Sequence, residues 1–148
     1  MGELIAALMI WISAYNGLPV PAEHPTVVLI DQCEIRQLHA GSAAVDCEDD
    51  SLHAEAIYMP ERKTIYLPDT WSAGNLGDVG TLLHELVHHM QFENGMDRKA
   101  ISCPGQQIEA PAYDAEISFL LAAGVDPYKT MQLPQIMLFF VTQCRGAM

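Results

Sequence analysis

The sequence has few basic residues. Seven Lys and Arg stand against nineteen Asp and Glu in 148 residues, which gives a formal net charge of −12. Binding to nucleic-acid phosphates requires a basic patch or stripe, and the basic side chains here are scattered along the chain. An anionic membrane surface would also repel this chain. The composition therefore excludes nucleic-acid binding from the expected functions, and the acidic side chains are interpreted as a solvated surface.

The sequence also lacks an apolar run long enough to cross a bilayer. The longest uninterrupted run extends from Leu4 to Ile12, whereas a transmembrane helix needs about 20 residues. A secretory signal begins with positive charge, but the residues before this run include Glu3 and no Lys or Arg. We therefore predict a folded N-terminal helix rather than a membrane span or a signal peptide.

No two of the four cysteines form a CxxC pair, which argues against a structural zinc site made of cysteines. Their spacing suits two disulfides, most naturally Cys33–Cys47 and Cys103–Cys144, although four cysteines allow about three connectivities. Disulfides would indicate a periplasmic or secreted protein. The alternative is four buried thiols in a cytoplasmic protein.

The first half of the chain has patterns typical of one helix followed by strands. Apolar residues at helical spacing extend from Leu4 to Tyr15 and stop before Gly17. The β-branched stretch 26–30 (TVVLI) predicts a buried strand, and residues 54–59 and 64–67 flank a polar turn typical of a hairpin. The mixed, acidic residues 31–51 indicate a loop with at most a short helical turn at its start.

The second half has helical patterns. Asp78 stands at an N-cap position, and apolar residues at helical spacing continue to Met90, before Asn94-Gly95. Further helices are expected at about 106–123 and from about 133 to 144. Early strands and late helices predict an α+β fold, and the length fits a single domain over residues 1–148.

The most informative stretch is His84-Glu85-Leu86-Val87-His88, an HExxH motif inside the predicted helix. Residues four apart lie on one face of a helix, so both imidazoles can bind one zinc ion. Glu85 projects in an adjoining direction, from which its carboxylate can reach a water on the metal. The motif therefore predicts zinc ligands at His84 and His88 and a catalytic carboxylate at Glu85.

A third ligand must come from elsewhere, because catalytic zinc usually has three protein ligands and one open position. The next predicted helix carries Glu109, Ala112, Tyr113 and Glu116 on one face. Ala112 is small enough to let the two helices approach closely. Glu109 is the expected third ligand and Glu116 the alternative.

The segments LLHELVHHMQ (82–91) and EAPAYDAE (109–116) resemble the gluzincin branch of the zincin metallopeptidases, in which an HExxH helix precedes a helix with a zinc-binding Glu. They are similar to small bacterial zincin-like domains of unknown function, and TIYLPDTW (64–71) resembles the strand and loop before their metal helix. The resemblance covers about residues 54–121. It implies a minimal zincin-like fold, with a small antiparallel sheet packed on the HExxH helix, a second ligand-bearing helix, and N- and C-terminal helices.

One position departs from this resemblance. Thermolysin-like gluzincins place an Asp four residues after the ligand Glu, but here Tyr113 occupies that position and Asp114 follows it. The group that orients the imidazoles is therefore open between Gln91, one turn after His88, and a backbone carbonyl. His89 should face another side of the helix, as a surface or supporting residue rather than a ligand.

The expected reaction is zinc-dependent hydrolysis of a peptide or protein substrate. Zinc lowers the pKa of its bound water and polarises the carbonyl, while Glu85 would take the proton from the water and pass it to the leaving amine. Tyr113 would donate to the oxyanion of the intermediate, or only pack against the site. Strand 64–67 would offer the edge on which an extended peptide pairs.

Two other functions fit the same residues. One is a non-catalytic zinc-binding module with a regulatory or binding role, whose cleft is covered by its own chain, for example by residues 145–148. The other is a helical protein in which the motif is coincidental. Glu85 favours hydrolysis, because a purely structural zinc site does not need this carboxylate.

Overall fold

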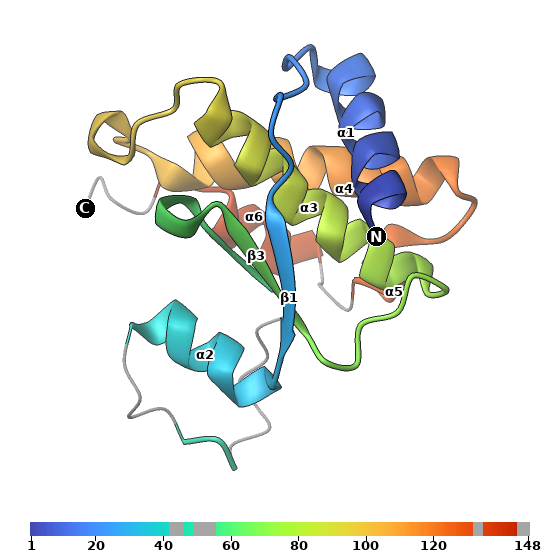
Figure 1. Ribbon diagram of the computed structural model, residues 1–148, viewed down its shortest axis with the longest axis vertical. Coiled ribbons are helices and arrows are strands. Elements are labelled where there is room, and N and C mark those ends of the chain that lie inside the picture. Colours follow the sequence, from blue (N-terminus) through green and yellow to red (C-terminus); the bar gives the residue numbers. More distant parts are fainter. Residues whose placement is uncertain (42–45, 49–55, 132–134, 145–148) are drawn as a thin grey trace.

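The computed structural model describes residues 1–41, 46–48, 56–131 and 135–144 (Figure 1). In this part of the chain the fold is mixed α+β, as the sequence predicts. The elements are α1 (Gly2–Asn16), β1 (Thr26–Ile30), α2 (Gln32–Ala40), β2 (Ile57–Met59), β3 (Thr64–Pro68), α3 (Leu76–Glu93), α4 (Ala110–Ala122), α5 (Pro127–Thr130) and α6 (Gln135–Val141). Among these helices, none is long and apolar enough to cross a membrane.

The sheet is mixed, not antiparallel as expected. The strand order is β1-β3-β2, with β1 parallel to β3 and β2 antiparallel to β3. The predicted hairpin is confirmed: β2 and β3 flank a 3₁₀ turn at Pro60–Arg62. The hairpin fits the antiparallel sheet that the resemblance implies, but β1 reaches β3 by a long crossover that includes α2, as a parallel pair requires.

The position of each strand in the sheet corrects two further expectations. β3 pairs on both sides, so residues 64–67 cannot offer a free edge. β1 is an edge strand rather than a buried one, and the side chain of Leu29 leaves 47 % of its surface exposed. The free edges of the described sheet belong to β1 and β2.

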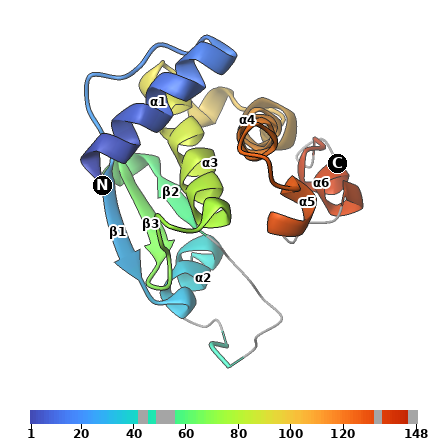
Figure 2. The same ribbon diagram turned by 90° about the vertical axis from the view of Figure 1, so that its right-hand side faces the viewer.

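Helix α3 lies between the sheet and α4 (Figure 2). Its apolar side chains pack with α1, with Ile65 and Leu67 of the sheet, and with Ala112 and Ala115 of α4 in one core. Because layers cover it on several sides, α3 is buried around most of its circumference. The buried residues of α3 are Val79, Gly80, Leu82, Leu83, His84, Glu85, Leu86, Val87, His88, His89, Met90 and Gln91.

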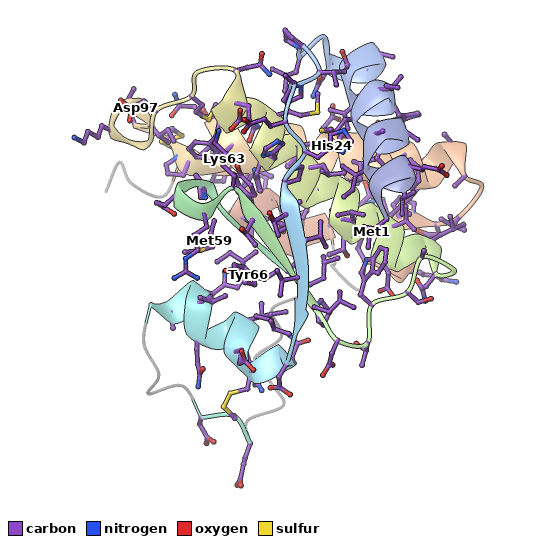
Figure 3. The ribbon with its side chains drawn as sticks, viewed as in Figure 1. Met1, His24, Met59, Lys63, Tyr66 and Asp97 are labelled. Atoms are coloured by element: carbon purple, nitrogen blue, oxygen red, sulfur yellow. A yellow bond between two sulfur atoms is a disulfide. The ribbon has the colours of Figure 1, made fainter. Side chains whose placement is uncertain are left out.

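Helix α2, at the start of the loop predicted over residues 31–51, is longer than the short helical turn expected there. Asp31 caps it by accepting a 2.8 Å hydrogen bond from the backbone N–H of Cys33, and Gly41 ends it at a φ of 68°. Its only buried residue is Ile35, so the sequence carries little apolar periodicity to reveal the helix. Met59 and Tyr66 lie on the face of the sheet toward α2 (Figure 3), opposite the face that packs on α3.

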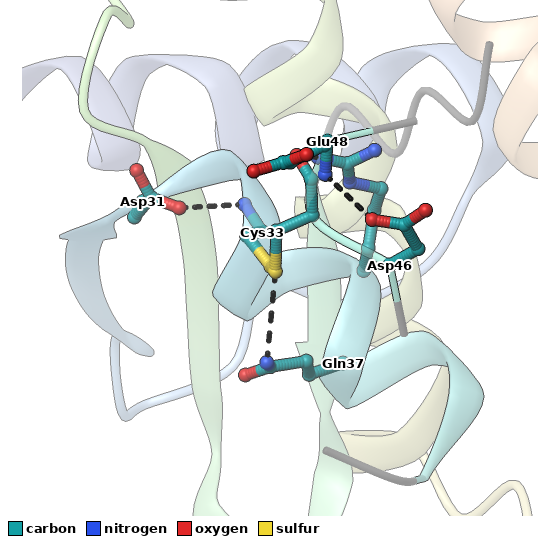
Figure 4. The surroundings of a disulfide bond; sticks show 7 residues. Asp31, Cys33, Gln37, Asp46 and Glu48 are labelled. Atoms are coloured by element: carbon teal, nitrogen blue, oxygen red, sulfur yellow. Dashed lines mark hydrogen bonds between the residues drawn. A yellow bond between two sulfur atoms is a disulfide. The ribbon is translucent and has the colours of Figure 1, made fainter. Parts of the chain in front are cut away.

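Both predicted disulfides are confirmed. Cys33 pairs with Cys47 at a Cα–Cα distance of 5.2 Å, and Cys103 pairs with Cys144 at 4.6 Å. The first bridge joins α2 to the short described segment 46–48 (Figure 4). The second joins the loop before α4 to the segment after α6. Two disulfides are typical of proteins from oxidising compartments.

Candidate metal centre

The helix that carries the HExxH motif begins earlier than the sequence predicts. Its N-cap is Asn75, whose side-chain oxygen accepts a 3.1 Å hydrogen bond from the N–H of Asp78. The Asp78 carboxylate, predicted to be the cap, instead accepts from the N–H of Ser72 at 2.9 Å. The predicted end at Asn94-Gly95 is confirmed, with Gly95 at a φ of 99°. His84 and His88 therefore lie in the middle of a long, firmly capped helix.

The two motif histidines converge on one carboxylate. His84 and His88 are both buried, and their ring centroids lie 4.9 Å apart. Nε2 of His88 is 2.7 Å from Oε1 of Glu109, and Nε2 of His84 is 3.6 Å from Oε2 of the same residue. One ligand atom from each residue lies within 4.8 Å of the others. The three residues predicted as ligands thus form a group that could hold a metal ion.

Glu109 reaches this group from a π turn, Gly105–Glu109, that leads into α4. The sequence predicts a regular helix over about 106–123, because no residue pattern distinguishes a π turn from an α turn. Such turns are often found at functional sites. Beyond it, Ala112 is fully buried in the core shared with α3, which agrees with the expected close approach of the two helices.

A side chain holds the second ring nitrogen of each histidine. Oε1 of Glu116 lies 2.9 Å from Nδ1 of His84, and Oε1 of Gln91 lies 3.0 Å from Nδ1 of His88. An acceptor at Nδ1 keeps the proton there and leaves the Nε2 lone pair for a metal. Glu116, the alternative ligand, thus contacts Nδ1 of His84, whereas Glu109 lies near Nε2 of the same ring. The sequence left Gln91 and a backbone carbonyl as candidates for orienting the imidazoles. The Gln91 side chain is the group that lies at Nδ1 of His88.

The carboxylates of Glu109 and Glu116 favour positive charge on the imidazole of His84. Burial lowers the pKa of His84, but hydrogen bonds to Glu109 and Glu116 outweigh it and hold that pKa well above its ordinary value. Burial likewise raises the pKa of Glu109, but the two histidines hold it far below the usual range. Burial raises the pKa of Glu116. Two imidazoles and one carboxylate form a donor set that could hold a metal ion.

The structure places both predicted catalytic side chains near this group. Glu85 is 8 % exposed, and its charge contributes to the raised pKa values of His84 and Glu116. Tyr113 is half-buried, and its ring packs edge-on against the ring of His84 at a centroid distance of 4.4 Å. Both side chains therefore neighbour the ligand group, on α3 and α4 respectively.

His89 faces another side of the helix than the ligand group, as predicted, but it is fully buried, so the surface position, one of its two expected places, is wrong. Its Nε2 is 3.0 Å from the carbonyl oxygen of Glu23, and its Nδ1 is 3.0 Å from the hydroxyl of Tyr58 on β2. The carbonyl can only accept, so Nε2 carries the proton and Nδ1 accepts from the tyrosine. Both ring nitrogens are thus engaged. Partners so distant in the chain leave no local signal in the sequence.

Comparison with known proteins identifies the family of this chain. Neither the curated proteins nor the solved structures contain a match to this chain. The family described as Domain of unknown function (DUF6647) matches residues 1–146, almost the whole sequence. The chain therefore belongs to the DUF6647 family.

Proposed function

We propose that this protein is a zinc-dependent peptide hydrolase of the zincin type. The observation that carries the proposal is the convergence of His84, His88 and Glu109 within 4.8 Å, with Glu85 buried on the same helix as both histidines. The ligand set has two imidazole nitrogens and one carboxylate, which suits zinc and leaves room for a water. The resemblance of residues 82–91 and 109–116 to gluzincins points to the same chemistry.

Each side chain has a distinct part in this reaction. Zinc, when bound, supplies a Lewis acid that polarises the carbonyl of the substrate and acidifies a water. Glu85 would take the proton of the attacking water and pass it to the leaving amine. Tyr113, packed against His84, donates a hydrogen bond to the oxygen on which negative charge develops. Glu116 and Gln91 keep the proton of each imidazole at Nδ1.

Substrate would enter from the side of Glu109. Its side chain is 34 % exposed, whereas those of His84 and His88 are exposed by 9 % and 10 %. Strand 64–67 cannot serve as the pairing edge for an extended peptide, because β3 is paired on both sides in the described sheet. A periplasmic or secreted location agrees with the two disulfides.

The experiment that tests this function compares Glu85→Gln with the native chain. Both proteins are washed with chelator, loaded with zinc, and assayed on a broad library of quenched peptides. We expect one zinc per chain in both, and a fall in cleavage rate of at least about 100-fold in the variant. Glu93→Gln is the matched control, because Glu93 lies on the same helix and forms an ion pair with Lys63 instead; its cleavage rate should be unchanged.

The same experiment separates hydrolysis from the alternative of a non-catalytic zinc-binding module. Residues 145–148, which that alternative uses as a cover, lie outside the described residues. Zinc at one per chain without cleavage of any peptide would contradict the proposed hydrolase and favour the module. Cleavage that persists in Glu85→Gln would contradict the part assigned to this carboxylate.

A further inference from the structure

The Cys103–Cys144 disulfide lies at the start of the segment that carries Glu109. Cys103 is buried and stands just before the π turn Gly105–Glu109. Its backbone N–H donates to Oε1 of Gln107 at 2.7 Å, and its carbonyl accepts from the N–H of Gln107 at 2.9 Å. Cys103 and the π turn are therefore joined by two hydrogen bonds, and a displacement of one moves the other.

The C-terminal segment is packed directly against this turn. A Cβ atom on Gly105 would overlap the backbone carbonyl of Gln143, the residue before Cys144. Glycine is thus the residue that lets the two backbones approach this closely. The disulfide and this contact together clamp the segment after α6 onto the first residues of the turn.

The other end of the turn is fixed by Gln91. Its Nε2 donates to the carbonyl of Ile108 at 3.2 Å, while its Oε1 accepts from Nδ1 of His88. Between these two attachments, Gln106 and Gln107 are exposed and Ile108 is only half-buried. Little apolar burial stabilises this stretch, so its conformation depends on the attachments at its two ends.

We propose that the Cys103–Cys144 bridge is a positioning element of the metal centre, which holds Glu109 where it completes the ligand set. Metal affinity then depends on the redox state of this bridge. The inference rests on the metal-binding part of the proposed function and adds a means of regulation to it. A side chain that must be ordered before it can bind a metal loses affinity when its support is removed.

The chemistry that would act on the bridge is thiol–disulfide exchange with a dithiol. A thiolate of the dithiol attacks one sulfur of the bridge and forms a mixed disulfide, and the other cysteine leaves as a thiol. The second thiol of the reagent then displaces the remaining cysteine. Two electrons and two protons pass to Cys103 and Cys144, and the dithiol becomes a disulfide.

The chain contains a matched control for this proposal. The Cys33–Cys47 bridge joins α2 to residues 46–48, and α2 contacts the face of the sheet opposite α3 (Figure 4). Both bridges close loops, of 14 and 41 residues in sequence separation, and both therefore restrict the unfolded chain. Only Cys103–Cys144 is attached to a segment that carries a ligand.

The experiment measures zinc affinity by competition with a chromogenic chelator for the native chain, Cys103→Ser/Cys144→Ser and Cys33→Ser/Cys47→Ser. Cobalt absorption spectra and thermal unfolding are recorded on the same preparations. We expect the first double variant to bind zinc at least about 10-fold more weakly, with a changed cobalt spectrum. The control pair should keep the native affinity. Equal affinity in all three proteins, or equal loss in both variants, overturns the proposal.

Gly105→Ala keeps the test decisive if the cysteine variants unfold, and a Glu109→Ala background tests whether the bridge acts through the ligand. Gly105→Ala retains both bridges but forces Gln143 away from the turn, and it should weaken zinc binding in the same direction. In a Glu109→Ala background, removal of the Cys103–Cys144 bridge should change affinity no further, because the bridge acts through Glu109. A full additional loss in that background would show that the bridge acts on the fold as a whole, which overturns the proposal.

The failure of this inference is distinguishable from the failure of the proposed function. If the native, fully oxidised chain binds no zinc, the metal centre itself is wrong and the inference fails with it. If the native chain binds zinc and the loss of Cys103–Cys144 leaves affinity unchanged, only the inference fails.

Discussion

Helix α3 presents two neighbouring histidines to two different environments. His88 faces Glu109 of the π turn, with Nε2 2.7 Å from the carboxylate. His89, the next residue, faces the sheet and bonds to Tyr58 and to the carbonyl of Glu23. Both side chains are buried, but Nε2 of His88 faces the group that could hold a metal ion, whereas both nitrogens of His89 are hydrogen-bonded elsewhere in the fold.

The difference teaches that the chemistry of a buried histidine is decided by what packs against it. On the ligand side, carboxylates from the π turn and α4 hold the pKa of His84 well above its ordinary value. On the sheet side, burial lowers the pKa of His89. The first face attracts cations, whereas the second keeps a neutral imidazole that links β2 to α3.

The largest expected effect is the difference in zinc affinity between His88→Ala and His89→Ala. His88→Ala should weaken zinc binding at least about 100-fold, because His88 is one of three protein ligands in the proposed site. His89→Ala should leave zinc affinity within about threefold. It should lower the free energy of unfolding by about 2–3 kcal/mol, because the buried Tyr58 hydroxyl loses its partner. Chelator competition and urea unfolding check both; similar zinc affinities in the two variants would remove the distinction between the faces.

A second expected effect concerns the face of α3 that carries His84 and His88. Glu116→Gln keeps the size of the side chain but removes the charge that faces Nδ1 of His84. We expect zinc affinity about 10- to 100-fold weaker with one zinc still bound at saturation. Zinc titration with cobalt as a spectroscopic probe measures this. A complete loss of stoichiometric binding would instead assign Glu116 as a ligand.

A third effect is a pH dependence of opposite sign on the two faces of the metal-free protein. The folded pKa of His84 lies above the ordinary 6.5, so its stabilisation is complete below about pH 6.5 and is lost as pH rises through the folded value. The folded pKa of His89 lies below 6.5, so its stabilisation is present above that pH and is lost as pH falls toward the folded value. Urea unfolding in the presence of chelator checks this for the native chain, His84→Gln and His89→Gln. The measurements cover about pH 5–9, the range of these titrations. The same sign for both variants would contradict it.

The smallest expected effect is that of Tyr58→Phe. The variant removes one hydrogen bond to Nδ1 of His89 and should cost about 1 kcal/mol of folding stability. Zinc affinity should stay at the native value, because the ligand group lies on the other face of α3. A measurable loss of zinc affinity would show that the two faces are coupled.

The sequence predicted the parts of this arrangement that depend on local spacing. The repeat of His84 and His88 on an amphipathic helix, and the common face of Glu109, Ala112 and Tyr113, follow from helical periodicity. Spacing favoured the observed cysteine pairing, in which each bridge joins two cysteines that are adjacent in sequence, but it left other connectivities open.

The sequence could not predict the parts that depend on how distant segments pack. Glu109 and Glu116 are both acidic and both lie on the same face, so spacing alone could not assign one as a ligand and the other as the partner of Nδ1. The environment of His89 depends on Tyr58 and Glu23, which lie far away in the chain. The parallel pairing of β1 with β3 likewise depends on the crossover through α2.

The most direct test of the central claim is the zinc content of the chelator-washed, zinc-reloaded chain, compared with that of the His84→Ala/His88→Ala double variant. We predict one zinc per native chain and none in the variant, with the variant still folded by circular dichroism. A native chain that retains no zinc, or a double variant that retains as much zinc as the native chain, would contradict the assignment of His84, His88 and Glu109 as a metal centre.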